Sequence, residues 1–402
     1  MTRVTDRDRR EPTRVLIAGG GVAALETMLA LRHHAGELVE VRMVAPLRDF
    51  VYRPLAVVEP FGRAPVHRFD LDALATGGGA TLVSSKVVEV APDEHRAVTD
   101  EGAVLAYDHL VVASGARPSR AFDGALTFWG IADGDEMTRL LADVCEGRAR
   151  RIAFAAHSGI GWHLPLYELA LLTACHLEDA GVTGVRIVLV THEADPLEVF
   201  GSVASQRARD LFAERGIELI TDRHPVRATE RGLEVVPAGT VDVDRVVTLP
   251  RLDGPGIEGL PTDDRGFIPT DGFGSVPGLP NVYAAGDATT FPVKQGGLAT
   301  QQAAAVATTI ASLAGAPVEP EPFRPVLRGM MLTGDQPEVM SRELRGGVGE
   351  TSSVGRSDDG VLTGKIAGGF LASHLTEIGG GALAGFDRSA PGAAAAAAGE
   401  AA

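Results

Sequence analysis

A six-residue stretch, Gly19–Ala24, constrains the fold more than any other part of this chain, and it reads GGGVAA. It matches the pattern GxGxxG/A, which in a strand–turn–helix unit binds the diphosphate of a dinucleotide. Gly19 makes the tight turn, Gly21 lets the backbone approach a pyrophosphate, and Ala24 lets the helix pack closely against the strand. The positive end of the helix then stabilises the phosphates.

The surrounding residues support this interpretation, because the motif lies between a strand-like and a helix-like run. Arg14–Ala18 is a short, mostly apolar run that stops at glycines, as a buried parallel strand does. A helix is predicted from Ala23 to His34 and the next strand from Val39 to Val44. The sequence therefore predicts a βαβ unit with a dinucleotide site.

One expected residue is missing from this unit. An acidic side chain usually follows the second strand and bonds the ribose of the nucleotide, but Ala45 stands there. Asp49 follows four residues later, which we expect to be too far away. The ribose ligand therefore stays open between Arg48 and a backbone group.

The middle of the chain repeats the same order of elements. A strand is predicted over Arg151–Ala156, a helix over Pro165–Asp179 and a strand over Val185–Thr191, followed by Glu193. Such a repeat predicts a second nucleotide-type domain. We expect Glu193 to be a solvated strand end, with a role as ribose ligand as the alternative.

The loop of this second unit departs from the pattern. Gly159 and Gly161 supply the first two glycines, but Leu164 stands where a third small residue should let the helix approach the sheet. Trp162 and His163 would have to point away from a bound pyrophosphate. The loop therefore favours a vestige or replacement of a nicotinamide site, and NAD(P)H binding is the alternative.

Composition narrows the class of protein. The chain has 402 residues, enough for two or three domains, and its net charge of −16 argues against nucleic acid and against an anionic membrane surface. No secretory signal and no apolar run long enough to span a bilayer is present, so we expect a cytoplasmic protein without membrane attachment. The two cysteines, Cys145 and Cys175, form no CxxC motif, so neither a disulfide scaffold nor a metal site is expected.

Two further stretches extend the pattern of the first unit. Residues 107–118 read YDHLVVASGARP, and residues 280–313 read PNVYAAGDATTFPVKQGGLATQQAAAVATTIASL. Together with FVYRPLAVVEPFG, PLYELALL, PFRPVLRGMMLTG and GKIAGGFLASHL, they make the chain resemble the FAD-dependent pyridine nucleotide-disulfide oxidoreductases. Within that superfamily the chain is most similar to the sulfide:quinone oxidoreductases and type II NADH dehydrogenases, and the likeness covers nearly the whole chain.

The resemblance implies an α/β fold with two Rossmann-like, three-layer dinucleotide-binding domains and a C-terminal cap. The FAD domain is expected to be discontinuous, over residues 1–120 and 246–320, around a degenerate NAD(P)-type domain over 121–245. The cap is expected over 321–375, and the alanine-rich segment 376–402 is expected to be disordered.

The resemblance also implies FAD as the cofactor, with its pyrophosphate at the first glycine loop. Asp287 would bond the ribityl chain, and the helix after Lys294 would bring its N-terminus to the pyrimidine end of the flavin. A helix N-terminus and a nearby lysine stabilise the negative charge of reduced flavin. The residues expected at the cofactor are Gly19, Gly21, Val22, Ala23, Ala24, Arg48, Tyr52, Arg53, Pro54, Ser114, Gly115, Gly286, Asp287, Lys294, Gln295, Gly296, Gly297 and Lys365.

The expected catalytic groups follow from what the chain lacks. The sulfide:quinone relatives carry a reactive cysteine in the middle loop and another later in the chain, but here Trp162 occupies the loop and no cysteine follows Cys175. A mechanism that needs a thiolate to carry sulfur is therefore not expected. His157 and His163 are the proton-carrying candidates of this loop, and with Lys294 they form the predicted catalytic set.

These features predict an FAD-dependent oxidoreductase that passes electrons from an unidentified small-molecule donor, through a single flavin, to a quinone or a small organic acceptor. Two alternatives stay open: an NAD(P)H dehydrogenase that uses the middle domain, and a flavin-binding interaction protein without turnover. The oligomeric state is also open, with a homodimer as one alternative.

The glycine loop generates the first prediction. The purified protein is expected to be yellow and to release FAD rather than FMN on denaturation, because FMN would leave the pyrophosphate site empty. Gly21→Val should abolish binding, since a branched side chain would occupy the space of a phosphate. Absorbance spectra and chromatography of the released flavin measure both outcomes, and a colourless wild type that takes up no added FAD would contradict the prediction.

Overall fold

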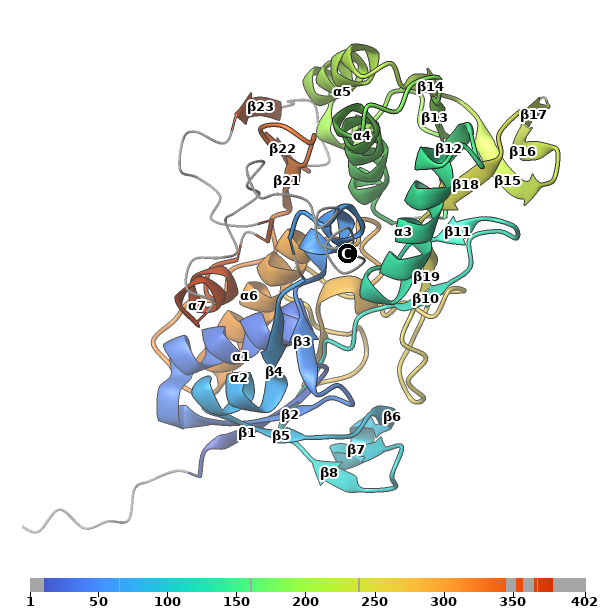
Figure 1. Ribbon diagram of the computed structural model, residues 1–402. Coiled ribbons are helices and arrows are strands. Elements are labelled where there is room, and N and C mark those ends of the chain that lie inside the picture. The colour runs from blue at the N-terminus through green and yellow to red at the C-terminus, as the bar shows by residue number, and fades with distance from the viewer. Residues whose placement is uncertain are drawn as a thin grey trace, which may run out of the picture.

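The structure is a computed structural model that describes residues 11–64, 66–159, 161–237, 239–344, 352–356, 365–366 and 368–378. Figure 1 shows two α/β halves with further strands and a helix from the C-terminal part of the chain lying against them. The first half contains the Gly19–Ala24 loop, and the second contains the loop around Gly161.

The first half is built on a five-stranded parallel sheet. Its strands are β1 (Thr13–Ala18), β2 (Val39–Val44), β5 (Ala80–Val83), β9 (His109–Val112) and β20 (Val282–Ala284). They lie in the order β20-β9-β1-β2-β5. The central strands β1 and β9 are apolar because both faces of the sheet are covered. Because β20 comes from far along the chain, this domain is discontinuous, as predicted.

Two helices, α1 (Val22–Ala35) and α6 (Gly296–Leu313), pack along each other beside this sheet (Figure 1). Small residues make the close packing possible. In η5 (Gly286–Ala288), a Cβ built on Gly286 would lie 2.9 Å from the Cβ of Ala23. The contact brings η5 against the first turn of α1, directly after the glycine loop.

The middle domain repeats this plan. Its strands are β11 (Leu126–Thr127), β12 (Arg151–Ala156), β13 (Arg186–Thr191), β14 (Glu218–Ile220) and β18 (Arg245–Thr248), in the order β11-β18-β12-β13-β14. All pairs are parallel. The helices are α3 (Ile131–Cys145), α4 (Leu164–Asp179) and α5 (Ser202–Glu214). The predicted fold class, two Rossmann-like domains of parallel strands and helices, is confirmed.

Smaller elements complete and join the two domains. The crossover is an antiparallel ribbon of β10 (Arg117–Ser119) and β19 (Arg251–Asp253). The first domain adds α2 (Leu71–Gly77), η2 (Arg53–Phe61), β3 (Asp49–Val51), β4 (Arg68–Asp70), β6 (Val87–Ala91), β7 (Arg96–Thr99) and β8 (Val104–Ala106). The middle domain adds β15 (His224–Thr229), β16 (Gly232–Val236) and β17 (Thr240–Val241).

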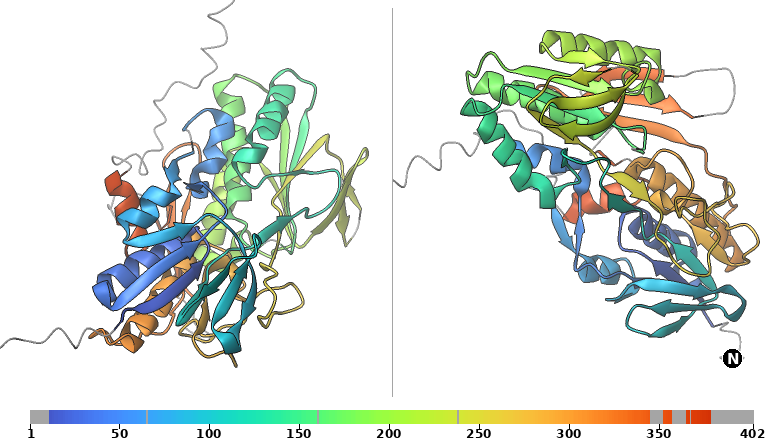
Figure 2. Two further views of the ribbon diagram at one scale, coloured as in Figure 1. Left: turned by 90° about the horizontal axis from the view of Figure 1, so that it is seen from below. Right: turned by 90° about the vertical axis from the view of Figure 1, so that its right-hand side faces the viewer.

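The C-terminal cap consists of β21 (Val326–Met331), β22 (Glu338–Glu343), β23 (Ser352–Arg356) and α7 (Leu371–Ile378). Figure 2 shows its antiparallel strands against the middle domain, whereas α7 lies beside α1 in Figure 1. The cap therefore contacts both domains. The predicted domain limits remain a prediction; β18 continues to Thr248 and α7 to Ile378, and most of the predicted tail lies outside the described residues.

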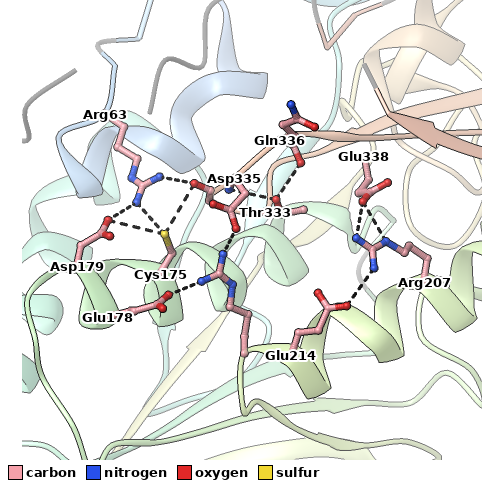
Figure 3. A network of polar contacts seen from close by, with 12 residues as sticks. Arg63, Cys175, Glu178, Asp179, Arg207, Glu214, Thr333, Asp335, Gln336 and Glu338 are labelled. Carbon is pink, nitrogen blue, oxygen red and sulfur yellow. Dashed lines mark hydrogen bonds and ion pairs between the residues drawn. The ribbon is translucent and has the colours of Figure 1, made fainter. Parts of the chain in front are cut away.

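Arginine side chains bond the turn between β21 and β22, and the first residue of β22, to α4 and α5 (Figure 3). Arg63 donates to the Gly334 carbonyl at 3.0 Å, to Asp179 at 2.9 Å and to the sulfur of Cys175 at 3.0 Å. Arg207 of α5 bonds Glu338 at 2.7 Å. These contacts join the turn to α4 and α5 of the middle domain and, through Arg63, to the first domain.

Three buried polar contacts anchor the rest of the cap. Lys365 donates to both carboxylate oxygens of Glu168 on α4, at 2.6 and 2.7 Å, and Glu168 is fully buried. Glu26 of α1 accepts from the first backbone N–H of α7, that of Leu371, at 2.7 Å. The backbone N–H of Ile366 donates to the Tyr52 hydroxyl at 3.1 Å. Buried charges and polar groups need such partners, so these positions fix the path of the segment.

The Glu168–Lys365 pair generates the second prediction. Lys365→Met should lower the free energy of unfolding by about 3–5 kcal/mol, because it leaves the buried Glu168 carboxylate without its cation. Adding Glu168→Leu to Lys365→Met should restore most of the loss, because both buried charges are then absent. Urea titrations of the three proteins measure this, and a single variant that is as stable as wild type would contradict the buried pairing.

Candidate functional site

The first glycine loop has the geometry of a pyrophosphate cradle. Gly19 has a φ of +143°, and a Cβ there would lie 2.2 Å from the carbonyl oxygen of Ala113. In contrast, a Cβ built on Gly21 would meet no atom within 4 Å. Gly21 is the N-cap of α1 and offers no side-chain cap, so the first N–H groups of the helix stay available to an anion. The loop therefore fits a diphosphate.

The expected ribose region lies at the end of β2. Ala45 is buried, and a Cβ built on Gly20 would lie 2.9 Å from the Cβ of Ala45, so position 20 has no room for a side chain beside Ala45. Asp49 lies in β3, paired with β4. The Arg48 side chain is exposed and has no hydrogen bond or ion pair within the described residues. Arg48 and backbone groups stay the two candidate ribose ligands.

Asp287 follows the contact between Gly286 and Ala23. Its carboxylate is half-buried, and no donor in the described part of the chain bonds it. Burial raises the pKa of Asp287, and the charges of Arg53 and Lys294 partly offset that effect. A deep carboxylate without a protein donor suits a ligand hydroxyl, so Asp287 fits the ribityl chain of FAD.

The N-terminus of α6 lies next along the chain. Gln295 caps it, its side-chain oxygen accepting from the Leu298 N–H at 2.9 Å. The N–H groups of Gly296 and Gly297 have no acceptor within the described residues, and Ile366 covers Gly296, where a Cβ would lie 3.2 Å from its side chain. Open N–H donors at the positive end of an 18-residue helix fit a negatively charged ring edge.

Tyr52, Arg53 and Pro54 lie at the start of η2. The Tyr52 hydroxyl accepts from the cap, and burial raises its pKa to about 12. The Arg53 guanidinium lies 4.7 Å from the centroid of the Trp129 ring. Arg53 is exposed as a residue, and partial desolvation of its guanidinium lowers its pKa while the charge of Asp287 opposes that shift. Pro54 is half-buried.

Lys294 is buried between the two domains. Its ammonium group donates to the Thr289 carbonyl and lies 3.8 Å from the centroid of the Phe267 ring. Burial lowers its pKa to about 8, although Asp287 and Asp263 oppose that shift. Lys294 is therefore a desolvated cation that titrates near neutral pH.

The remaining cofactor candidates have different surroundings. Ser114 is exposed, and Gly115 has a φ of +73° with no atom within 4 Å of a built Cβ, so this turn is open to a ligand. Lys365 pairs with Glu168, so a protein carboxylate already neutralises its charge. Contact of these residues with FAD stays a prediction.

The second glycine loop is closed by protein. A Cβ on Gly159 would lie 3.1 Å from the His157 ring and 3.3 Å from the Arg251 side chain. A Cβ on Gly161 would lie 2.6 Å from Cγ of Lys294, whose backbone N–H donates to the Gly161 carbonyl at 3.0 Å. Helix α4 begins at Leu164, one residue earlier than predicted. Side chains thus fill the space that Gly21 leaves open in the first loop.

The two loop histidines face the middle domain. His157 Nδ1 accepts from the Gly159 N–H at 2.9 Å, and His163 Nδ1 lies 3.9 Å from Glu193. Burial lowers the pKa of both, so both are neutral at pH 7. The His163 ring lies 5.0 Å from that of His192. Their catalytic role stays a prediction.

The sequence-based expectation for Glu193 is wrong. Glu193 is not a solvated strand end, since it is 3% exposed and accepts from the Tyr167 hydroxyl at 2.7 Å and the Thr191 hydroxyl at 2.9 Å. These donors come from α4 and β13, so the packing of the helix on the sheet places them there. A carboxylate with two hydroxyl donors needs no ribose to satisfy it.

Both cysteines are free thiols outside the predicted flavin site. Cys175 is fully buried under the cap turn, where a Cβ on Gly334 would lie 2.8 Å from its sulfur. Cys145 is half-buried at the end of α3, 3.9 Å from the His176 ring nitrogen. Each thiol thus contacts helix or cap residues, as core cysteines do.

Sequence reasoning missed two buried acids, Glu26 and Glu168. Both stand inside helices of mostly apolar residues, VAALETMLAL and LPLYELALL. An acidic residue at such a position is almost never fully buried without a partner, which was the available signal. The partners themselves lie more than 190 residues away in sequence.

Fold and site together define a flavoprotein of the two-dinucleotide-domain class, and comparison with known proteins agrees. The chain matches the family model described as pyridine nucleotide-disulphide oxidoreductase over residues 13–151 and 169–307. Because these stretches make up more than half of the chain, the chain belongs to this family. Its members are FAD-dependent oxidoreductases, which confirms the predicted cofactor and enzyme class. The unmatched residues 152–168 contain the middle loop.

Individual relatives are more distant. The sulfide-quinone reductase of Aquifex aeolicus is 25% identical over 52% of this chain and 50% of its own length. A chloroplastic/mitochondrial alternative NAD(P)H-ubiquinone oxidoreductase of Arabidopsis thaliana is 24% identical over 71% of this chain and 62% of its own. The chain thus spans less than two thirds of these curated relatives.

Solved structures extend the similarity of fold. The sulfide:quinone oxidoreductase of Aquifex aeolicus superimposes with a TM-score of 0.76 at 19% identity, covering 85% of this chain and 87% of that one. NDH2 of Plasmodium falciparum, in complex with NADH, gives 0.64 at 13% identity, covering 93% and 95%. Within the described residues no helix is long and apolar enough to cross a membrane, and no cluster of potential metal ligands occurs.

Lys294 generates the third prediction. Between pH 8 and pH 10.5 the unfolded chain keeps the Lys294 proton while the folded chain has released it, so the free energy of unfolding should rise with pH. The gain from pH 8 to pH 10 should be about 2 kcal/mol in cofactor-free wild type and absent from Lys294→Met. Urea titrations at the two pH values give the difference, and equal slopes would show that Lys294 is not desolvated.

Proposed function

We propose that this protein is an FAD-dependent oxidoreductase that passes electrons through a single flavin to a quinone or a small organic acceptor, without a nicotinamide site. The contrast between Gly21 and Gly161 carries this proposal. A Cβ on Gly21 would have 4 Å of clear space, whereas one on Gly161 would lie 2.6 Å from Lys294. A diphosphate needs space directly beside the glycine, which Gly21 offers and Gly161 does not.

The negative charge of a cleft in the middle domain also supports the absence of a nicotinamide site. A cleft of about 620 Å³ beside the middle loop is lined by the carboxylates Glu193, Asp195 and Glu198, with Arg342 as its one cationic lining residue among those described. Negative charge beside the cleft disfavours a diphosphate, and it is offset in part where Asp195 pairs with Arg209 at 2.6 Å. The Plasmodium falciparum structure with NADH supports the alternative that the middle domain accepts NAD(P)H, since its fold is shared.

The chemistry proposed for the site uses few groups. FAD supplies the two-electron chemistry when bound. The open N–H groups of Gly296 and Gly297, with Lys294, stabilise negative charge at the pyrimidine end. His157 and His163, neutral near pH 7, accept protons from a donor that reaches the loop.

Quinone as acceptor is supported by the names of the relatives, two of which are quinone reductases. Sulfide as donor is not supported, because neither cysteine borders the proposed site. We further propose a reducing, cytoplasmic setting, which the two unpaired thiols favour.

Anaerobic stopped-flow absorbance tests the electron path. Neither NADH, NADPH nor sulfide should bleach the flavin within seconds, whereas dithionite-reduced protein should be reoxidised by a soluble quinone. The Cys145→Ala/Cys175→Ala variant should behave like wild type and lose about 1 kcal/mol of stability for each change.

Each contrary result has one meaning. Millisecond bleaching by NADH would establish the NAD(P)H dehydrogenase alternative. Sulfide-dependent bleaching that disappears in the folded double-cysteine variant would establish a thiol mechanism. A reduced flavin that neither a quinone nor a small organic oxidant reoxidises would leave the interaction-protein alternative.

A further inference from the structure

The middle loop and Lys294 form one packed unit. The Lys294 N–H donates to the Gly161 carbonyl at 3.0 Å, and the space next to the Gly161 Cα is taken by Cβ and Cγ of Lys294. At its other end, the ammonium group is held by the Thr289 carbonyl and the Phe267 ring. Backbone, stem and charged group of this side chain are therefore all fixed.

Gly161 is required here for space and not for backbone conformation. Its φ is outside the left-handed region that favours glycine, so alanine could adopt the same backbone angles. A Cβ at 2.6 Å from the Lys294 stem, however, forces the stem to move, since real Cβ atoms do not approach so closely. The lack of a side chain at Gly161 therefore leaves the space that the Lys294 stem occupies.

Several charged side chains interact electrostatically with Lys294, so the strength of these interactions depends on where its ammonium group lies. Asp287, Asp263 and Arg265 act on it electrostatically, and Arg53 acts on Asp287. No carboxylate forms an ion pair with Lys294 within the described residues, whereas Lys365 pairs with Glu168 and Lys86 is exposed. The buried charge of Lys294 is therefore free to act on a bound flavin, and a small displacement changes that action strongly at low dielectric.

We propose that the second glycine loop is a positioning element for Lys294, in which Gly161 sets the distance of the Lys294 charge from the flavin. The inference rests on the proposed FAD site and gives the second glycine loop a role in the absence of a bound nicotinamide. A loop with the pattern of a dinucleotide site thereby tunes the reduction potential of the cofactor bound in the other domain. Gly161 is a positioning residue, because it acts only through Lys294.

A double-mutant cycle tests this coupling. The proteins are wild type, Gly161→Ala, Lys294→Ala and the double variant, with Gly77→Ala as the matched control, since a Cβ there meets no atom within 4 Å. The midpoint potential of bound flavin and the thermal unfolding midpoint are measured for each protein at pH 7 and pH 9.

Lys294→Ala should lower the potential at pH 7, favouring the oxidised form at least tenfold, or about 30 mV for a two-electron couple. Gly161→Ala should also shift the potential and lower the unfolding midpoint by a few degrees. In the Lys294→Ala background Gly161→Ala should change both far less, because the Cγ at 2.6 Å is absent and only the Cβ of residue 294, at 3.2 Å, remains. The Gly77→Ala control should match wild type throughout.

Additive effects in the cycle would overturn the inference, as would a Gly161→Ala protein that is less stable but has an unchanged potential. If Gly161→Ala alone fails to fold, recovery of folding in the double variant supports the coupling, and failure of both overturns it. Failure of wild type to bind FAD would instead refute the proposed function, so the two ideas are tested separately.

Discussion

The absence of one carbon atom at Gly19 sets the geometry on which the rest of the site depends. The α-carbon of Gly19 lies so close to the Ala113 carbonyl that a Cβ would come within 2.2 Å of that oxygen. The ends of β1 and β9 therefore lie close together. Gly286 allows a similar close approach, because a Cβ there would lie 2.9 Å from the Cβ of Ala23. These two contacts bring the loop, the Ser114 turn and Asp287 to one edge of the sheet, although the three segments lie far apart in sequence. In a parallel α/β sheet this edge, at the carboxyl ends of the strands, is where ligands bind.

Much of this arrangement could be predicted from the sequence, because it depends on local patterns. The strands Val39–Val44 and Arg151–Ala156 have their predicted bounds, α1 is one residue longer than predicted at each end, and α4 begins one residue earlier. Short apolar runs that stop at glycines are strong local signals in parallel sheets. The local pattern predicts a dinucleotide site, the resemblance to the family implies that the dinucleotide is FAD, and the family match confirms this cofactor.

The state of the second glycine loop could not be predicted in the same way. Trp162, His163 and Leu164 indicate from the sequence that the second loop departs from the pattern. The contact that fills the space beside Gly161, however, comes from Lys294, more than 130 residues further along the chain. Glu193 was misjudged for a related reason. A strand end is usually solvated, but the Tyr167 hydroxyl reaches Glu193 from a helix whose packing no local pattern specifies. Tertiary contacts over long sequence separations decide such cases, and one sequence does not display them.

The anchoring of the cap has a consequence for the order in which the protein is made. Ile366 covers the N-terminus of α6, and its segment is held by residues of the first domain and of α4. On the ribosome, which synthesises the chain from its N-terminus, this segment follows every residue that anchors it. Both nucleotide-type domains are thus complete while the end of α6 is still uncovered. The N-terminus of α6 is therefore covered last, by a segment that can make its buried contacts only after both domains have been synthesised.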